Sequence, residues 1–215
     1  NAGSTNRFEA EAVKLKPDCS EYYACRAWVR TRLGEYDSAM ADAEKAVRLD
    51  PNNASAYSIL GDIHRELGDT GRAIGDFNEA IRINPYSDDF YVNRGSALIE
   101  EGKYGASIKD FKKALELNPK NANAHNDLGI AYLRTDDCDN ALICCNKAIE
   151  LNPDNPEFLK NRASVYFKKK DYGKALTNLN TVVLYVPENS EAYFDRGVVY
   201  KEQGRLELAI ADFSK

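Results

Sequence analysis

Apolar positions along the chain recur at helical spacing, and the pattern itself repeats. The stretch 54–87 reads ASAYSILGDIHRELGDTGRAIGDFNEAIRINPYS, with two apolar-periodic segments on either side of a short turn that contains Gly68. Residues at i, i+3, i+4 and i+7 share one helix face, so each such stretch predicts a helix, a turn and a second helix. The rest of the chain repeats this unit, which predicts an all-α protein.

The repeat has a fixed period of 34 residues. Six of the seven prolines lie on this grid, and only Pro156 falls outside it. A fixed period between 20 and 50 residues is the signature of a repeat array. The prolines on the grid are Pro17, Pro51, Pro85, Pro119, Pro153 and Pro187, and a column of small residues keeps the same period at Ala27, Gly61, Gly95, Gly129, Ala163 and Gly197.

The period predicts one continuous array. Residues 1–19 combine a presumed cloning remnant, Asn1 to Ser4, with the second helix of a partial repeat at Phe8 to Lys16. Five full repeats then follow, and residues 190–215 form a truncated sixth. Because each repeat buries its apolar face only against its neighbours, and neither end has an obvious polar cap, we expect a fragment of a longer protein. The full repeats are 20–53, 54–87, 88–121, 122–155 and 156–189.

These columns resemble the tetratricopeptide repeat, whose 34-residue pattern has an aromatic, Leu-Gly, Tyr, Ala, Phe, Ala and Pro in order. The resemblance covers nearly the whole chain. It implies a right-handed superhelical solenoid of antiparallel helix pairs, with the first helix of each pair lining a concave face.

Local signals place the helix ends. A column of Asn and Ser precedes the first helices and predicts N-terminal caps, at Asn53, Ser87, Asn121, Asn155 and Asn189. A glycine in left-handed conformation is expected to close the first helix, at Gly34, Gly68, Gly102 and Gly204. Asp136 and Lys170 replace glycine in two repeats, so these two turns are expected to be looser or differently shaped.

Composition narrows the class of protein. Of 215 residues, 43 % are hydrophobic and 29 % are charged, which is typical of a foldable soluble chain without a transmembrane helix. The net charge of −5, with both signs interspersed, argues against nucleic acid and anionic membranes as partners. Five cysteines without a disulfide spacing predict small buried residues in a reducing, cytoplasmic compartment.

Catalytic, metal and cofactor signatures are lacking in the sequence. The two histidines, His64 and His125, lie in different repeats and form no catalytic or zinc motif. The glycines match neither a P-loop nor a dinucleotide fingerprint. We therefore predict a protein that is not an enzyme and that takes no cofactor and no metal.

Two charged columns predict structural ion pairs between helices. Arginines recur in the first helix at Arg26, Arg94, Arg162 and Arg196, and aspartates recur in the second helix at Asp42, Asp76, Asp110 and Asp212. Pairs between these columns would tie adjacent helices together, which we favour over ligand binding.

The candidate site follows from the groove-facing columns that the resemblance implies. One column, Asn93, Asp127, Asn161 and Asp195, resembles the asparagine ladder of the O-linked N-acetylglucosamine transferases and would hold a peptide backbone, since amides both donate and accept. Its Asp rungs favour basic ligand groups. Flanking columns add polar and apolar contacts, with Phe167 and Phe194 as the main anchors. The flanking residues are Asn126, Ile130, Leu133, Lys160, Phe167, Phe194 and Val198.

The residues argue against one known ligand of the family. A carboxylate clamp for the acidic tail of heat-shock chaperones needs Lys and Asn four apart and Asn in the next repeat. Here Lys160 is followed by Ser164, and Asp195 stands where Asn is needed. An aspartate there would repel the carboxylate of the tail.

We therefore predict a non-catalytic scaffold that captures an extended segment or partner helix of another protein on its concave face, in repeats three to six. Two alternatives stay open. The chain could be the targeting arm of an enzyme whose catalytic domain lies outside it, or it could self-associate through open array ends. The first copies, with Trp28, Thr31, Asp62 and Arg65 at the matching places, are left outside the predicted site.

Overall fold

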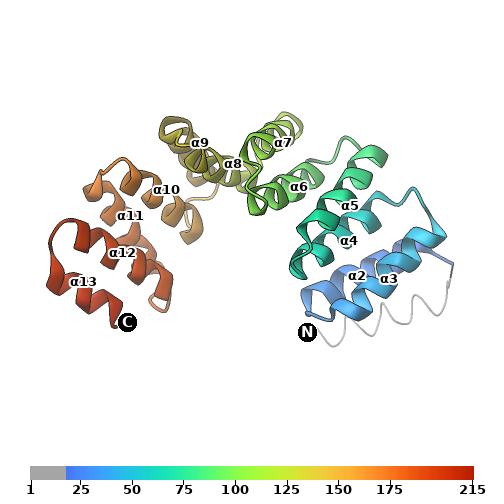
Figure 1. Cartoon of the computed structure of the whole chain (residues 1–215), viewed down its shortest axis with the longest axis horizontal. Helices are drawn as coiled ribbons and strands as arrows, with labels where there is room; N and C mark the ends of the chain where they lie inside the picture. The colour runs from blue at the N-terminus through green and yellow to red at the C-terminus, as the bar shows by residue number, and fades with distance from the viewer. Residues whose placement is uncertain (1–17) are drawn as a thin grey trace. The chain divides into compact units, whose positions relative to one another are not determined.

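The computed structural model describes residues 18–215, and all regular secondary structure in this part of the chain is α-helical (Figure 1). The predicted all-α fold class is therefore confirmed. The partial repeat predicted at Phe8 to Lys16 lies outside the described residues. The helices are α2 Ser20–Arg32, α3 Tyr36–Leu49, α4 Ala54–Glu66, α5 Thr70–Ile83, α6 Asp88–Glu100, α7 Tyr104–Leu117, α8 Ala122–Arg134, α9 Cys138–Leu151, α10 Pro156–Lys168, α11 Tyr172–Tyr185, α12 Ser190–Glu202 and α13 Leu206–Phe213.

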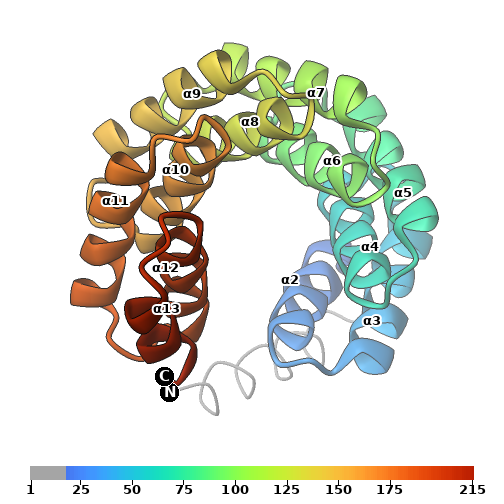
Figure 2. The same ribbon diagram turned by 60° about the vertical axis from the view of Figure 1, so that its left-hand side comes forward.

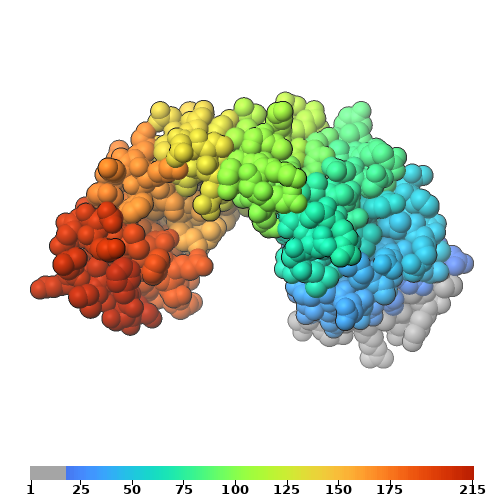
Figure 3. All heavy atoms as spheres, in the orientation of Figure 1, coloured from blue at the N-terminus to red at the C-terminus, as the bar shows by residue number. Residues whose placement is uncertain are grey.

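The chain folds as two compact units, one ending at Leu117 and the other comprising Asn118–Lys215. We call them the N-terminal and C-terminal units and describe each by itself. Each unit contains three helix pairs in its described part, α2–α3, α4–α5 and α6–α7 in the first and α8–α9, α10–α11 and α12–α13 in the second. Atoms of neighbouring helix pairs lie against each other within each unit (Figure 3).

Within a unit the helices form two layers. Figure 2 shows α2, α4 and α6 on one side of the N-terminal unit and α3, α5 and α7 on the other. First helices contact each other across repeats, as α2 does α4 and α8 does α10. Each second helix packs against the first helix of the following repeat, as α3 does α4 and α9 does α10. The first helices therefore share one surface in the N-terminal unit, and in the C-terminal unit α8 contacts α10, whose Lys160 pairs with Glu191 of α12.

The predicted caps form at most first helices. The side chains of Asn53, Asn121, Asn155 and Asn189 each accept a hydrogen bond from a backbone N–H of the first turn. Ser87 occupies the cap position of α6 but makes no such bond. At α2 the cap position is Cys19, whose side chain makes no capping bond either.

The turn between the two helices of a pair keeps one geometry, and our prediction for Asp136 and Lys170 is wrong. Both residues adopt the left-handed conformation, with φ of 64° and 60°, as the glycines do in the other pairs. The residue that follows each of them donates to a carbonyl five residues earlier, as in the glycine-containing turns. Helix pairing in the fold thus imposes the left-handed turn even where a side chain makes it costly.

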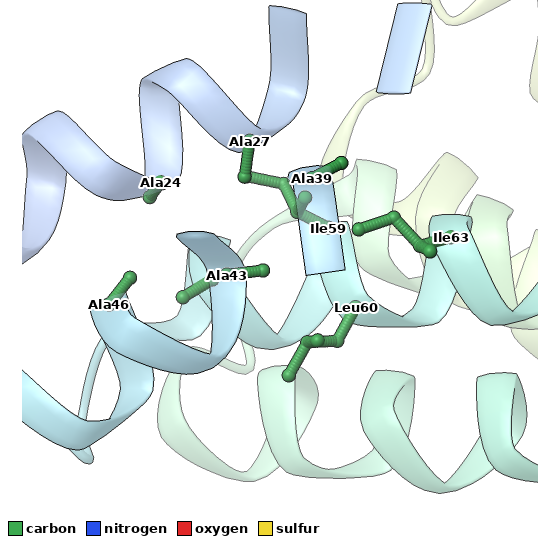
Figure 4. Packing of buried hydrophobic residues seen from close by; sticks show 9 residues of the cluster. Ala24, Ala27, Ala39, Ala43, Ala46, Ile59, Leu60 and Ile63 are labelled. Carbon is green, nitrogen blue, oxygen red and sulfur yellow. The ribbon is translucent and has the colours of Figure 1, made fainter. Parts of the chain in front are cut away.

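The small-residue column has a packing cause. A Cβ added to Gly61, Gly95 or Gly197 would lie 2.5–2.8 Å from the nearest ring carbon of the phenylalanine sixteen residues later, at Phe77, Phe111 or Phe213. Where the first-helix residue is alanine, the facing residue is smaller: Ala43 opposite Ala27 and Leu179 opposite Ala163. The alanines of α2 and α3 pack with Ile59, Leu60 and Ile63 of α4 (Figure 4).

The arginine and aspartate columns form the predicted ties, most completely in the third and sixth repeats. Arg94 donates twice to the carboxylate of Asp110, at 2.6 and 2.7 Å, and once to the amide oxygen of Asn78 in the preceding repeat, at 2.7 Å. Arg196 makes the same contacts with Asp212 and Asn180. Each of these arginines therefore joins a first helix to two second helices, and we call the arrangement an arginine clip.

The remaining repeats modify the clip. Arg26 binds Asp42 through two hydrogen bonds of 2.6 Å. Arg162 binds the amide oxygen of Asn178 in place of an aspartate, and it also donates to the amide oxygen of Asn146 in the preceding repeat at 2.9 Å. In the second repeat the arginine is replaced by Leu60, and His64 one turn later contacts Asp76 at 2.6 Å. Asp42, Asn178 and Asp76 on these second helices thus each have a basic partner on the first helix of the same repeat.

Candidate peptide-binding surface

The predicted site residues fall into the two units. Asn93 belongs to the N-terminal unit, where its amide donates to the Ser58 hydroxyl at 3.4 Å. The other ten lie in the C-terminal unit, on the first helices α8, α10 and α12. We therefore treat the two surfaces separately.

Four residues predicted in the C-terminal unit come together at one hollow of about 200 Å³ between α10 and α12. The side chain of Leu179 from α11 contributes to its lining. Phe167 is half-buried and packs on Tyr172, with ring centroids 5.7 Å apart, whereas Phe194 is 60 % exposed. The predicted residues at this hollow are Phe167, Phe194, Asp195 and Val198.

Asp195 gives the hollow a negative group. Its side chain is half-buried, and burial is the main reason that the pKa of its carboxyl is raised, while Lys160 lowers it and Glu191 and Glu157 raise it. Among residues 18–215 the Asp195 carboxyl has no hydrogen bond or ion pair. A carboxylate beside Phe167 and Phe194 would favour a ligand with both apolar and basic groups.

Lys160 is engaged within the protein. Its ammonium pairs with Glu191 and, at 3.0 Å, with Glu157, and only 13 % of its side chain is exposed. Burial lowers the pKa of Lys160, but the bonds to Glu191 and Glu157 outweigh it and raise the pKa. Lys160 therefore stays charged and acts first as a link between α10 and α12.

The amide ladder on α8 and α10 is internally bonded. Asn126 is buried, accepts a hydrogen bond of 2.9 Å from the Asn161 amide and donates to Asp127 at 3.1 Å. These amides are therefore already partnered in the absence of a peptide. Ile130 and Leu133 are half-buried on α8, and Leu133 packs against a cluster that includes Val165.

The N-terminal unit holds residues that sequence reasoning left outside the site. Two adjoining hollows of about 330 and 360 Å³ share Trp28, Arg32, Ile59, Asp62 and Asn93. Trp28 is the only tryptophan of the chain and is 51 % exposed. The signal in the sequence was a large aromatic on the groove-facing side of the first full repeat.

The cysteines fit the predicted role only in part. Cys144 and Cys145 are buried, and burial raises the pKa of the Cys145 thiol to about 12, so this thiolate does not form at neutral pH. Cys25 is exposed, and the prediction of a buried residue is wrong there. No group of three or more metal-ligating side chains gathers within the described residues. In the same range no helix combines the length and apolar character needed to cross a bilayer.

Stacked helix pairs of one repeating pattern define a helical-repeat protein. Family models identify which one. A TPR repeat model matches residues 95–136 and 163–204, and tetratricopeptide repeat models match residues 8–88, 122–155 and 144–177. The chain belongs to the tetratricopeptide repeat family. A comparison with curated protein sequences gives no match.

Solved structures show the same fold at low identity. The chain is similar to one in the APC/C hetero-tetramer Cut9–Hcn1, with a TM-score of 0.89 and 17 % identity over 99 % of this chain and 42 % of that one. PilF of Pseudomonas aeruginosa has a TM-score of 0.78 and 18 % identity, over 90 % of this chain and 88 % of that one. YrrB, described as a TPR protein with an unusual peptide-binding site, has a TM-score of 0.65 and 22 % identity, over 86 % and 95 %.

Proposed function

We propose that this chain is a non-catalytic scaffold that captures an extended peptide segment of another protein on the first-helix surface of its C-terminal unit. The observation that supports the proposal is the hollow between α10 and α12, where Phe167, Phe194, Asp195 and Val198 meet. Apolar walls with a few polar groups are typical of sites that bind peptides and small ligands. The proposed ligand places one apolar side chain between the two phenylalanines and a basic group near Asp195.

The internal bonding of the amides changes how the peptide would be held. The Asn161 amide donates to Asn126, whose own amide donates to Asp127, so a peptide backbone that replaced these bonds would gain little. Affinity would come from the apolar anchors. Both rings have an aromatic neighbour, Phe194 on Phe213 at 5.6 Å and Phe167 on Tyr172 at 5.7 Å between centroids. Phe194 is the residue to test, because it is 60 % exposed whereas Phe167 is half-buried.

The test uses a displayed library of random ten-residue peptides selected on the whole chain. Binding of enriched peptides is then measured by calorimetry with Phe194→Ala and with Ile143→Ala as matched control. Ile143 is 66 % exposed on α9, a second helix, so both variants remove one exposed apolar side chain. We expect Phe194→Ala to weaken binding about tenfold or more and Ile143→Ala to leave it unchanged.

If no enriched peptide binds Phe194→Ala more weakly than the parent, the proposed site is contradicted. A selection that enriches no peptide would contradict capture of extended segments altogether. The two alternatives from the sequence, a targeting arm and self-association, stay predictions.

A further inference from the structure

Trp28 lies on α2, in the first-helix surface of the N-terminal unit. It lines the two hollows described above and a third, of about 480 Å³, whose other residues include Ala24, Cys25 and Ile59. Tryptophan is enriched at interfaces, because covering its large ring removes much apolar surface from water. The ring therefore offers an anchor with one apolar side and one charged side.

Asp62 on α4 supplies the charge on that second side. It is half-buried, and in residues 18–215 no donor forms a hydrogen bond or ion pair with its carboxylate. Asp42 and Asp110, which are buried, each accept at least two hydrogen bonds from arginine side chains. Burial raises the pKa of Asp62 to about 6, partly offset by Arg65 and Arg32. A carboxylate withdrawn from water without a partner is costly for the protein alone and favourable for a cationic ligand.

The other polar and charged groups around these hollows come from α2, α3, α4 and α6. Arg32 of α2 is exposed, with its guanidinium 5.6 Å from the centre of the Trp28 ring. On α4, Arg65 lies 3.7 Å from Glu66. Glu21 of α2, Tyr36 of α3 and Asp89 of α6 also line these hollows. Burial raises the pKa of the Asp89 carboxyl, as does the charge of Asp88. The hollow toward α6 thus holds two carboxylates against one arginine.

We propose that this surface of the N-terminal unit binds a basic side chain, arginine or lysine, of an extended peptide. The cationic group pairs with Asp62 and Asp89, and the aliphatic stem of the side chain lies along Trp28. Arg32 shows that this ring accepts a guanidinium. The incoming cation takes that place, and Arg32, which is exposed, moves into solvent.

An anionic ligand fits the same residues less well. A carboxylate held by Arg32 and Arg65 would come close to Asp62 and leave the charge of that aspartate without a partner. Like charges at a partly desolvated site repel each other strongly. The two cases predict opposite effects of Arg32, which competes with a cation and attracts an anion.

Trp28 is also the reporter, because it is the only tryptophan of the chain. Its fluorescence, excited at about 295 nm, is followed while the whole chain is titrated with acetylated, amidated seven-residue peptides of Ser, Ala and Gly. The central residue is Arg, Lys, citrulline or Glu. Citrulline keeps the shape of arginine without its charge. We expect saturable changes with Arg and Lys peptides and none with citrulline or Glu.

Two variants test the assignment. Asp62→Asn keeps the shape and removes the charge, and we expect it to weaken the Arg peptide at least tenfold. Arg32→Gln removes the competing cation, and we expect it to tighten binding two- to fivefold. Phe194→Ala, in the other unit, should leave this titration unchanged, so this proposal and the one for the C-terminal unit fail independently. Saturable binding of the Glu peptide that Arg32→Gln weakens would overturn the proposal in favour of an anion, and an Asp62→Asn variant that binds as the parent does would overturn it outright.

Discussion

At the residue scale, the contact between glycine and phenylalanine within a repeat sets how close the two helices lie. A Cβ at Gly95 would lie 2.8 Å from two carbons of the Phe111 ring, closer than side-chain carbons tolerate. We expect Gly95→Ala to lower the free energy of unfolding by about 1–3 kcal/mol, because the core is overpacked at that point. Urea denaturation followed by circular dichroism measures the change.

The chain itself suggests the compensating change and the control. The fifth repeat pairs Ala163 with Leu179, so Phe111→Leu added to Gly95→Ala should recover part of the loss. Gly105→Ala, where an added Cβ meets nothing within 4 Å, should be neutral or stabilising by about 0.5 kcal/mol. A double variant as unstable as the sum of its singles would show that the contact does not limit helix approach.

Asp62 carries a stability cost that depends on pH. Its pKa in the fold is raised to about 6, from 3.8 in the unfolded chain, so the folded state favours its protonated form. Below about pH 4 this carboxyl is protonated in both states and costs no stability. As pH rises through 6 the folded state must ionise a buried carboxyl, and the free energy of unfolding falls. Asp62→Asn should therefore raise the free energy of unfolding at pH 7.5 by about 1–2 kcal/mol, the value being reduced by partial exposure to solvent.

The check is urea denaturation of the parent and Asp62→Asn at pH 7.5 and pH 4.5, since the difference between the two proteins isolates this group. The stabilisation should shrink at the lower pH. An equal difference at both pH values would mean that the carboxyl is not perturbed by burial. A variant that is more stable and binds the Arg peptide less well would connect the cost to the proposed recognition.

At the scale of the elements, the arginine clip joins helices across the repeat boundary. Arg94→Leu would leave the carboxylate of Asp110 buried without a partner and would free the amide of Asn78. We expect a loss of about 2–4 kcal/mol in the free energy of unfolding. Adding Asp110→Cys reproduces the pair of the fourth repeat, Leu128 with Cys144, and should recover most of it. A double variant no more stable than Arg94→Leu would show that the unpaired carboxylate is not the cause.

The sequence was sufficient to predict the helices and most of their caps, because apolar periodicity and capping chemistry are local. It misjudged the turns at Asp136 and Lys170, since the stacking of helix pairs enforces a left-handed residue against its own preference. Four predicted site residues gather at one hollow, at Phe194 and its neighbours. The sequence placed Asp62 on the groove-facing side of its helix but could not predict that its carboxylate lacks a partner, because this depends on side chains from several helices.

At the scale of the whole molecule, similarity to solved structures at 17–22 % identity establishes the fold alone. What distinguishes this chain is which side chains each repeat presents. The two first-helix surfaces differ in character: the N-terminal one centres on Trp28 with Asp62, and the C-terminal one on Phe167 and Phe194 with Asp195. Both combine an aromatic side chain with a carboxylate that lacks a partner among the described residues, and the two proposals rest on this combination.

The arginine clip also limits which repeats can be duplicated in tandem. Each clip that reaches back does so from an arginine to an asparagine sixteen residues earlier, so a repeat carries a requirement for the one before it. A tandem copy of 156–189 would set Arg162 against Asn180 and keep the bond. A tandem copy of 88–121 would set Arg94 against Lys112, two like charges. Some repeats can therefore be duplicated without losing this bond and others cannot, so the order of the repeats is itself constrained.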